Sequence, residues 1–101
     1  MTQATVVRYQ TSPEAADENE RLIRAVFAEL NEEQPEGLRY ASFRLDDGVS
    51  FLHVAIVDAE VNPLTKSAAF AEFQGEIGAR VVEGPTPSGA KVIASYRLPV
   101  D

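Results

Sequence analysis

Apolar residues recur along the chain with two different periods, one typical of helices and one typical of strands. Within residues 13–34 they form a single stripe that predicts an amphipathic helix: Leu22, Ile23, Val26, Phe27 and Leu30. Ser12 and Pro13 are a capping residue and a first-turn proline, so the helix should begin there. It should end near residues 31–34, because Pro35 and Gly37 follow.

A second stripe of the same kind predicts a helix over about Ser67 to Arg80. Its apolar residues are again three or four positions apart: Phe70, Phe73, Ile77 and Val81. Asn62-Pro63 marks a turn or a short helical segment before it. Gly75 and Gly78 each weaken this helix by about 1 kcal/mol relative to alanine. They either let the helix pack closely against a sheet or loosen it beside a pocket.

Segments rich in β-branched and aromatic residues predict four strands. They cover residues 4–10, 38–46, 49–58 and Lys91–Leu98. Asp47-Gly48 lies between the middle two, and this dipeptide is a strong hairpin signal. Residues Glu83–Gly89 contain two prolines and two glycines, which predicts a loop.

The elements follow one another as strand, helix, strand, strand, helix, strand. This order predicts an α+β protein with a ferredoxin-like βαββαβ fold, in which a four-stranded antiparallel sheet carries both helices on one face. Right-handed crossovers give the strand order 4-1-3-2. A chain of 101 residues without an internal linker supports one domain, spanning residues 1–101.

The predicted hairpin also assigns residues to the two faces of the sheet. With a two-residue turn at Asp47-Gly48, the numbers of paired residues sum to 95, as 47 and 48 do. One face has an apolar middle that suits the helices, with the pairs Arg39–Ile56, Ala41–Val54 and Phe43–Leu52. The opposite face mixes aromatic, polar and basic groups, with the pairs Tyr40–Ala55, Ser42–His53 and Arg44–Phe51. Because that mixed face is too apolar to remain in water, we expect a second copy to cover it, giving a homodimer with a closed barrel.

Composition and charge narrow the function classes. The chain has no cysteine, which excludes a disulfide scaffold and a thiol enzyme. Its net charge of -7 disfavours nucleic acids and anionic membranes as partners. The N-terminus shows no secretory pattern and no segment is apolar enough to span a bilayer, so we expect a cytoplasmic protein.

The candidate ligand-binding residues lie on the predicted strands. His53, the single histidine, could act as a base or haem ligand, or it could line the dimer barrel with its hydrogen bonds satisfied. Three tyrosines could line a pocket for an aromatic ligand: Tyr9, Tyr40 and Tyr96. Arg44 and Arg97 could hold a carboxylate or a phenolate, or form ion pairs. One histidine without cysteine argues against a transition-metal site, so no metal is expected.

The C-terminal half resembles a pattern in small members of a known family. The residues that carry it are Asn62-Pro63-Leu64, Ala69-Phe70-Ala71-Glu72-Phe73, Ile77, Arg80, Glu83-Gly84-Pro85 and Ala94-Ser95-Tyr96-Arg97. Together with the βαββαβ order, they resemble the antibiotic biosynthesis monooxygenase-like family of the dimeric α/β-barrel superfamily. The resemblance implies a homodimer with a pocket between the sheet and the helices of each subunit.

Relatives of this kind differ in activity, so the resemblance leaves two main functions open. Some oxidise polycyclic aromatic molecules with O2 and no metal or flavin, while others degrade haem or cyclise polyketides. The oxygenases often use tryptophan, asparagine, tyrosine or histidine, but this chain has no tryptophan and no asparagine on a predicted strand, so no catalytic set transfers residue by residue. The first function is a cofactor-independent, monooxygenase-like enzyme acting on a small aromatic or polyketide-like molecule. The second is a non-enzymatic dimeric module that binds a small molecule or acts as an accessory, and a haem-binding relative is a third.

Overall fold

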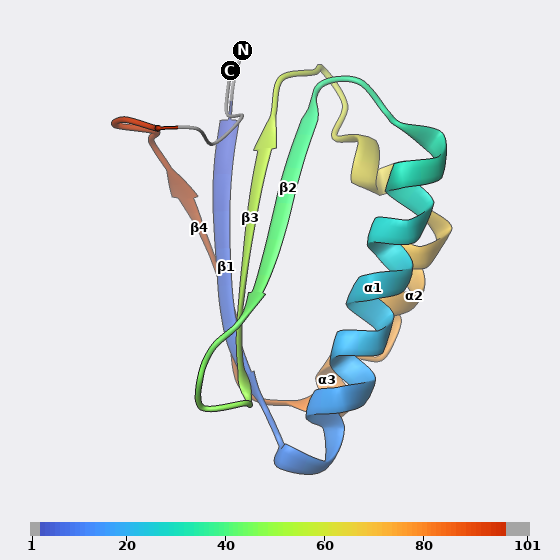
Figure 1. Ribbon diagram of the computed structural model, residues 1–101, viewed down its shortest axis with the longest axis vertical. Coiled ribbons are helices and arrows are strands. Elements are labelled where there is room, and N and C mark those ends of the chain that lie inside the picture. The colour runs from blue at the N-terminus through green and yellow to red at the C-terminus, as the bar shows by residue number, and fades with distance from the viewer. Residues whose placement is uncertain (1–2, 97–101) are drawn as a thin grey trace.

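A computed structural model describes residues 3–96 and shows a single sheet with helices on one side (Figure 1). The elements in chain order are β1 (Gln3–Thr11), η1 (Pro13–Ala15), α1 (Ala16–Glu33), β2 (Leu38–Arg44), β3 (Ser50–Val57), η2 (Pro63–Lys66), α2 (Ala68–Gly75), α3 (Ile77–Arg80) and β4 (Val81–Ala90). The strands are antiparallel and lie in the order β2-β3-β1-β4, which confirms the predicted topology. All three α-helices cover the same face, so the fold is the predicted ferredoxin-like one.

The hairpin has the predicted register but a longer turn. Leu38 pairs with Val57 and Arg44 with Phe51, as the sum of 95 requires. The backbone N–H of Leu45 donates to the carbonyl of Ser50 at 2.9 Å, so the loop has four residues, 46–49, rather than two. Both loop lengths give the same pairs. The Asp47 carboxylate accepts hydrogen bonds from the Ser50 hydroxyl and from the backbone N–H groups of Val49 and Ser50. These bonds keep the pKa of Asp47 below its usual range.

The last strand lies earlier in the chain than the sequence predicts. Residues Glu83–Gly89, expected as a loop, belong to β4, whereas residues 91–96 of the expected strand Lys91–Leu98 leave the sheet and the remainder lies outside the described residues (Figure 1). Prolines are tolerated here because β4 is an edge strand that pairs only with β1. Gly84 has φ +87°, and a Cβ there would lie 2.9 Å from the carbonyl oxygen of Arg8, so this irregular pairing requires glycine.

The second predicted helix is interrupted. Its residues form α2 and α3, with a break at Glu76, between Gly75 and Ile77, and η2 is the short helical segment expected before it. A Cβ on Gly75 or Gly78 would meet nothing within 4 Å, so close packing is not the reason for these glycines. The helix is instead loosened beside a cavity that Phe73 and Ile77 line.

The assignment of the two sheet faces from sequence is wrong. Phe51 and His53 are buried beneath the helices, in a core that includes residues of α1, α2 and β1: Tyr9, Leu22, Ile23, Val26 and Phe73. The face with the predicted apolar middle lies outward, and Phe43 on it is 48% exposed. The reason is that the polar groups of the buried face find hydrogen-bond partners from β1 and α1, which offsets the cost of their burial.

Candidate functional site

A cavity of about 320 Å³ lies between the helix-facing side of the sheet and α2. Its wall is mainly apolar and aromatic, with residues from all four strands and from the α2 region: Thr5, Val7, Tyr9, Tyr40, His53, Ala55, Val57, Asn62, Leu64, Phe70, Phe73, Gln74, Ile77, Pro85 and Pro87. A concave, mostly apolar space with a few polar groups is typical of a small-molecule site. Three of the six residues predicted to bind a ligand therefore line one cavity: Tyr9, Tyr40 and His53.

His53 is the polar centre of this wall. The residue is 4% exposed, and its ring forms an edge-to-face contact with the Phe73 ring, with centroids 5.6 Å apart. The Tyr9 hydroxyl lies 2.7 Å from Nε2. The Ser42 hydroxyl lies 2.6 Å from Nδ1, and the Tyr40 hydroxyl is 3.2 Å from the same atom. A neutral imidazole has a single lone pair for a metal, and a hydroxyl lies within hydrogen-bond distance of either nitrogen that carries it, so the haem-binding alternative loses its support.

A second layer of buried polar groups lies behind Tyr9. The Asn19 side chain, on α1, donates from Nδ2 to the Tyr9 hydroxyl at 2.8 Å. Arg80, on α3, donates from Nε to Asn19 Oδ1 at 2.9 Å and from Nη2 to the carbonyl of Phe73 at 2.7 Å. Arg80, Asn19, Tyr9 and His53 thus form one continuous chain of hydrogen bonds, which we call the buried relay. Among the described residues, every buried side-chain nitrogen or oxygen has a hydrogen-bond partner.

Burial sets the protonation states along the relay. It lowers the pKa of His53 to about 4, so the imidazole is neutral at neutral pH. Burial also raises the pKa of Tyr9 to about 12, although the bond from Asn19 opposes the change. The pKa of Tyr40 is raised by burial too. The relay therefore presents neutral groups to the cavity, with the charge of Arg80 behind them.

Acidification should destabilise the protein through His53. The unfolded imidazole takes up a proton near pH 6.5, whereas the folded one does so only near pH 4. Between these values the unfolded state holds more protons, so the free energy of unfolding falls as the pH drops, by about 3 kcal/mol across the window. Urea unfolding at several pH values measures this slope. In His53→Phe the slope between pH 6.5 and 4 should be much flatter, and equal slopes in both proteins would contradict a buried neutral His53.

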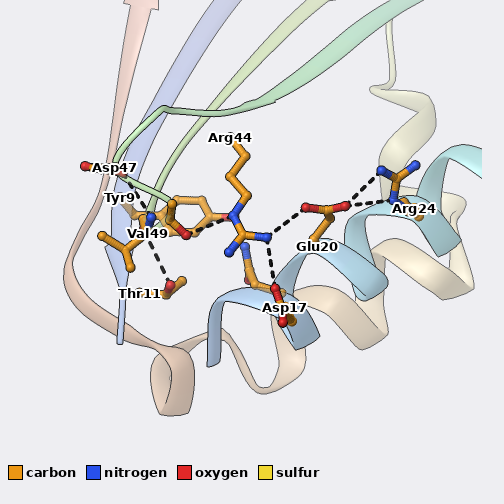
Figure 2. Close-up of polar contacts among 10 residues, drawn as sticks. Tyr9, Thr11, Asp17, Glu20, Arg24, Arg44, Asp47 and Val49 are labelled. Carbon is orange, nitrogen blue, oxygen red and sulfur yellow. Dashed lines mark hydrogen bonds and ion pairs between the residues drawn. The ribbon is translucent and has the colours of Figure 1, made fainter. Parts of the chain in front are cut away.

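Arg44 lies outside the cavity, in a neighbouring hollow of about 470 Å³ between α1 and β2. Its guanidinium Nη1 is 3.1 Å from Asp17 Oδ1 and 2.9 Å from Glu20 Oε1, and its Nε donates to the carbonyl of Gly48 at 2.8 Å (Figure 2). Glu20 also pairs with Arg24. Arg44 therefore joins the end of β2 to α1 through ion pairs, one of the two roles expected for it. Tyr40 lines both spaces.

The last two predicted ligand-binding residues are not part of the cavity. Tyr96 follows β4 and is 81% exposed, away from the cavity wall. Its expected place on a strand depended on the predicted strand Lys91–Leu98, which does not form over residues 91–96. Arg97 lies outside the described residues.

The sequence prediction missed three polar residues of the site: Asn19, Ser42 and Arg80. Asn19 lies three positions before Leu22, on the apolar stripe of the first helix, and Arg80 lies three positions after Ile77 on the second. A polar residue on an apolar helix stripe was the sequence signal that could have identified both residues as buried polar groups. Ser42 was paired with His53 in the predicted hairpin, but on a face assigned to the partner subunit.

Residues 3–96 contain no cluster of three or more histidine, cysteine or acidic side chains that could hold a metal ion. Nor does any helix within that range have the length and apolarity needed to cross a membrane.

The sequence matches no protein-family model and no curated protein. Its structure matches many solved ones. Rv0793 from Mycobacterium tuberculosis is 14% identical with a TM-score of 0.76, over 94% of this chain and 98% of that one. PA3566 from Pseudomonas aeruginosa is 18% identical with a TM-score of 0.72, over 93% and 97%. A structure named antibiotic biosynthesis monooxygenase is 19% identical with a TM-score of 0.66, over 93% and 100%.

The same name is given provisionally to matching structures from Nitrosomonas europaea, Bordetella bronchiseptica and Chloroflexus aurantiacus. At identities this low, the likeness shows a shared fold. The fold predicted from the sequence and its resemblance to these proteins are thereby confirmed.

Proposed function

We propose that this chain, which has the fold of the antibiotic biosynthesis monooxygenase-like proteins, is an enzyme that oxidises a small hydroxylated aromatic or polyketide-like molecule with O2 and without a cofactor. The observation that carries the proposal is the cavity itself. It combines an aromatic wall at Phe70 and Phe73 with the hydroxyl and imidazole groups of Tyr40 and His53. A planar aromatic ring fits the first part, and an oxygen substituent of that ring fits the second.

The chemistry follows from hydrogen bonding to that oxygen. When Tyr40 and His53 donate to a ligand carbonyl, negative charge on the oxygen is stabilised, and a CH2 group conjugated with that carbonyl loses a proton to solvent more readily. The resulting enolate is electron-rich and reduces O2. In the complete reaction a CH2 group and O2 become a C=O group and water, so one oxygen atom becomes the new carbonyl oxygen. The other leaves with the two hydrogens.

Dithranol, a dihydroxylated anthrone, is a suitable probe because it has both groups on a planar ring. In air, the protein should convert dithranol to its quinone faster than buffer alone does, and oxygen-18 gas should label the new carbonyl. Absorbance and mass spectrometry measure the two results. A rate equal to that of buffer, with the probe bound, would contradict an enzymatic role.

One observation favours the non-enzymatic alternative, a module that only binds its ligand. The relay is complete without a ligand, since Tyr9, Ser42 and Tyr40 already engage His53. The hydrogen bonds of such a site are complete when the cavity is empty, and they are explained without any catalytic role. Binding of dithranol without formation of quinone would select this alternative.

For the partner, we propose a homodimer formed through the outer face of the sheet. This face carries apolar residues at its centre, half-buried or exposed in the single chain: Val6, Ala41, Phe43, Leu52 and Val54. No helix of the described chain covers it (Figure 1). A second copy supplies a matching apolar surface with two-fold symmetry. From the sequence we expected the second copy to cover the other face of the sheet, which carries His53.

Replacing Leu52 by glutamate should give a monomer. Leu52 lies on β3, inside the sheet, so a charge there would be buried against the second copy at a high cost. Native mass spectrometry measures the mass of the assembly. Thr65→Glu adds the same charge at an exposed position of η2 and should leave the dimer intact. A monomeric wild-type protein would contradict the proposal.

A further inference from the structure

The buried relay has a direction, which begins at Arg80. A guanidinium group can only donate hydrogen bonds, so the atom of Asn19 that faces Arg80 Nε must be its oxygen, Oδ1, 2.9 Å away. This fixes the orientation of the amide. Its Nδ2 atom therefore faces Tyr9 and donates to the hydroxyl at 2.8 Å.

Tyr9 and His53 have fixed donor and acceptor roles as well. The Tyr9 oxygen accepts from Asn19, so its single proton is donated to Nε2 of His53, 2.7 Å away. A neutral imidazole that accepts at Nε2 carries its proton on Nδ1. That N–H group points to two hydroxyls, of Tyr40 at 3.2 Å, which lines the cavity, and of Ser42 at 2.6 Å, which lines the hollow beside Arg44. Every bond of the relay thus runs from Arg80 to His53 in the cavity wall.

We propose that Arg80 and Asn19 are positioning residues, which hold His53 in its Nδ1–H form and so make the cavity end of the relay a hydrogen-bond donor. The consequence of this donor for ligand binding rests on the function proposed above. The site then selects ligands that present an accepting oxygen, a carbonyl or an ionised phenol. It disfavours ligands that must donate at this point.

The charge of Arg80 supports this selection. The residue is 6% exposed and its guanidinium lies over the Phe73 ring, 5.3 Å from the centroid. Within residues 3–96 it forms no ion pair with a carboxylate. The nearby carboxylate of Glu18 feels the charge of Arg80 only at a distance, so this buried positive charge still favours negative charge on a nearby ligand. Phe73 also lines the cavity, so the same ring borders both the guanidinium and the ligand space.

Asn19→Asp tests the direction of the relay with a nearly isosteric change. A carboxylate beside Arg80 stays ionised and can only accept. It should therefore accept the proton of Tyr9, and the Tyr9 oxygen should then accept from His53. The imidazole proton should move to Nε2, which reverses the relay. Because the chain has a single histidine, nitrogen-15 NMR of the tag-free protein reports this tautomer directly.

The expected result is Nδ1–H in the wild type and Nε2–H in Asn19→Asp. Asn31→Asp makes the same change at an exposed position of α1 and should keep the wild-type spectrum. Arg80→Met removes the fixed donor without adding a charge, so Asn19 can turn over and both tautomers should be present. Nε2–H in the wild type, or unchanged spectra in both relay variants, would overturn the proposal.

The ligand supplies a second readout. Under argon, Asn19→Asp should bind dithranol about tenfold more weakly than the wild type, because the cavity end then accepts instead of donating. Unchanged affinity would overturn the selection of accepting oxygens. The NMR result is independent of catalysis. If the tautomers behave as expected and no quinone forms in air, the enzymatic proposal fails while the positioning role stands.

Discussion

Replacement of His53 by phenylalanine should lower the turnover of dithranol by about 10²–10³-fold. Phenylalanine keeps the planar ring between Tyr9 and Phe73, where the imidazole now lies stacked on one ring and edge-on to the other. It removes the Nδ1–H group and with it the link between Tyr9 and the cavity. Loss of one donor that stabilises a developing oxyanion has an effect of this size. Stopped-flow absorbance of quinone formation measures it.

Tyr40→Phe serves as the second variant if His53→Phe folds poorly. It removes only the hydroxyl that lies 3.2 Å from His53 and keeps the stacking on Phe27, whose ring centroid is 5.0 Å away. The fall in turnover should again exceed tenfold. Tyr96→Phe is the matched control, since this tyrosine is 81% exposed and outside the cavity. Wild-type rates in both His53→Phe and Tyr40→Phe would place the chemistry elsewhere.

The second large effect concerns stability. Phe73→Ala should lower the free energy of unfolding by about 3–5 kcal/mol, because truncation of a buried aromatic ring removes its transfer free energy and leaves a void. The ring is 3% exposed and contacts His53 and Phe70, with centroids 5.6 Å and 6.3 Å away. It also lies under the guanidinium of Arg80. Urea unfolding at pH 7 measures the loss.

Val61→Ala provides the comparison for this variant. Val61 is 57% exposed, and surface substitutions of this kind usually change stability by less than about 0.5 kcal/mol. A loss below about 1 kcal/mol for Phe73→Ala would mean that the cavity wall is not a packed part of the core. Both the fold of α2 against the sheet and the proposed site would then need revision.

Local patterns were sufficient to predict most of the fold from the sequence. The stripe from Leu22 to Leu30 defined α1, and Asp47-Gly48 placed the hairpin. The pairing of Ser42 with His53 followed from the turn alone and brought two groups of the site together. These features depend on neighbouring residues, which a sequence shows directly.

The errors arose where long-range contacts decide the outcome. The segment at Glu83–Gly89 pairs with β1 despite its prolines, because an edge strand leaves half of its N–H groups unpaired. The sheet face that carries His53 is buried because Tyr9 and Asn19, which are distant in sequence, complete the hydrogen bonds of its polar groups. Neither composition nor periodicity contains that information. The two main omissions, Asn19 and Arg80, are polar residues on apolar stripes, whose partners only the fold identifies.

A crystal structure of the protein with dithranol, grown under argon, tests the central claim most directly. The ring should lie against Phe70 and Phe73, with an oxygen of the probe within hydrogen-bond distance of Tyr40 or His53 Nδ1. Dithranol in the hollow beside Arg44, or a cavity that is closed by side chains and excludes the probe, would contradict it.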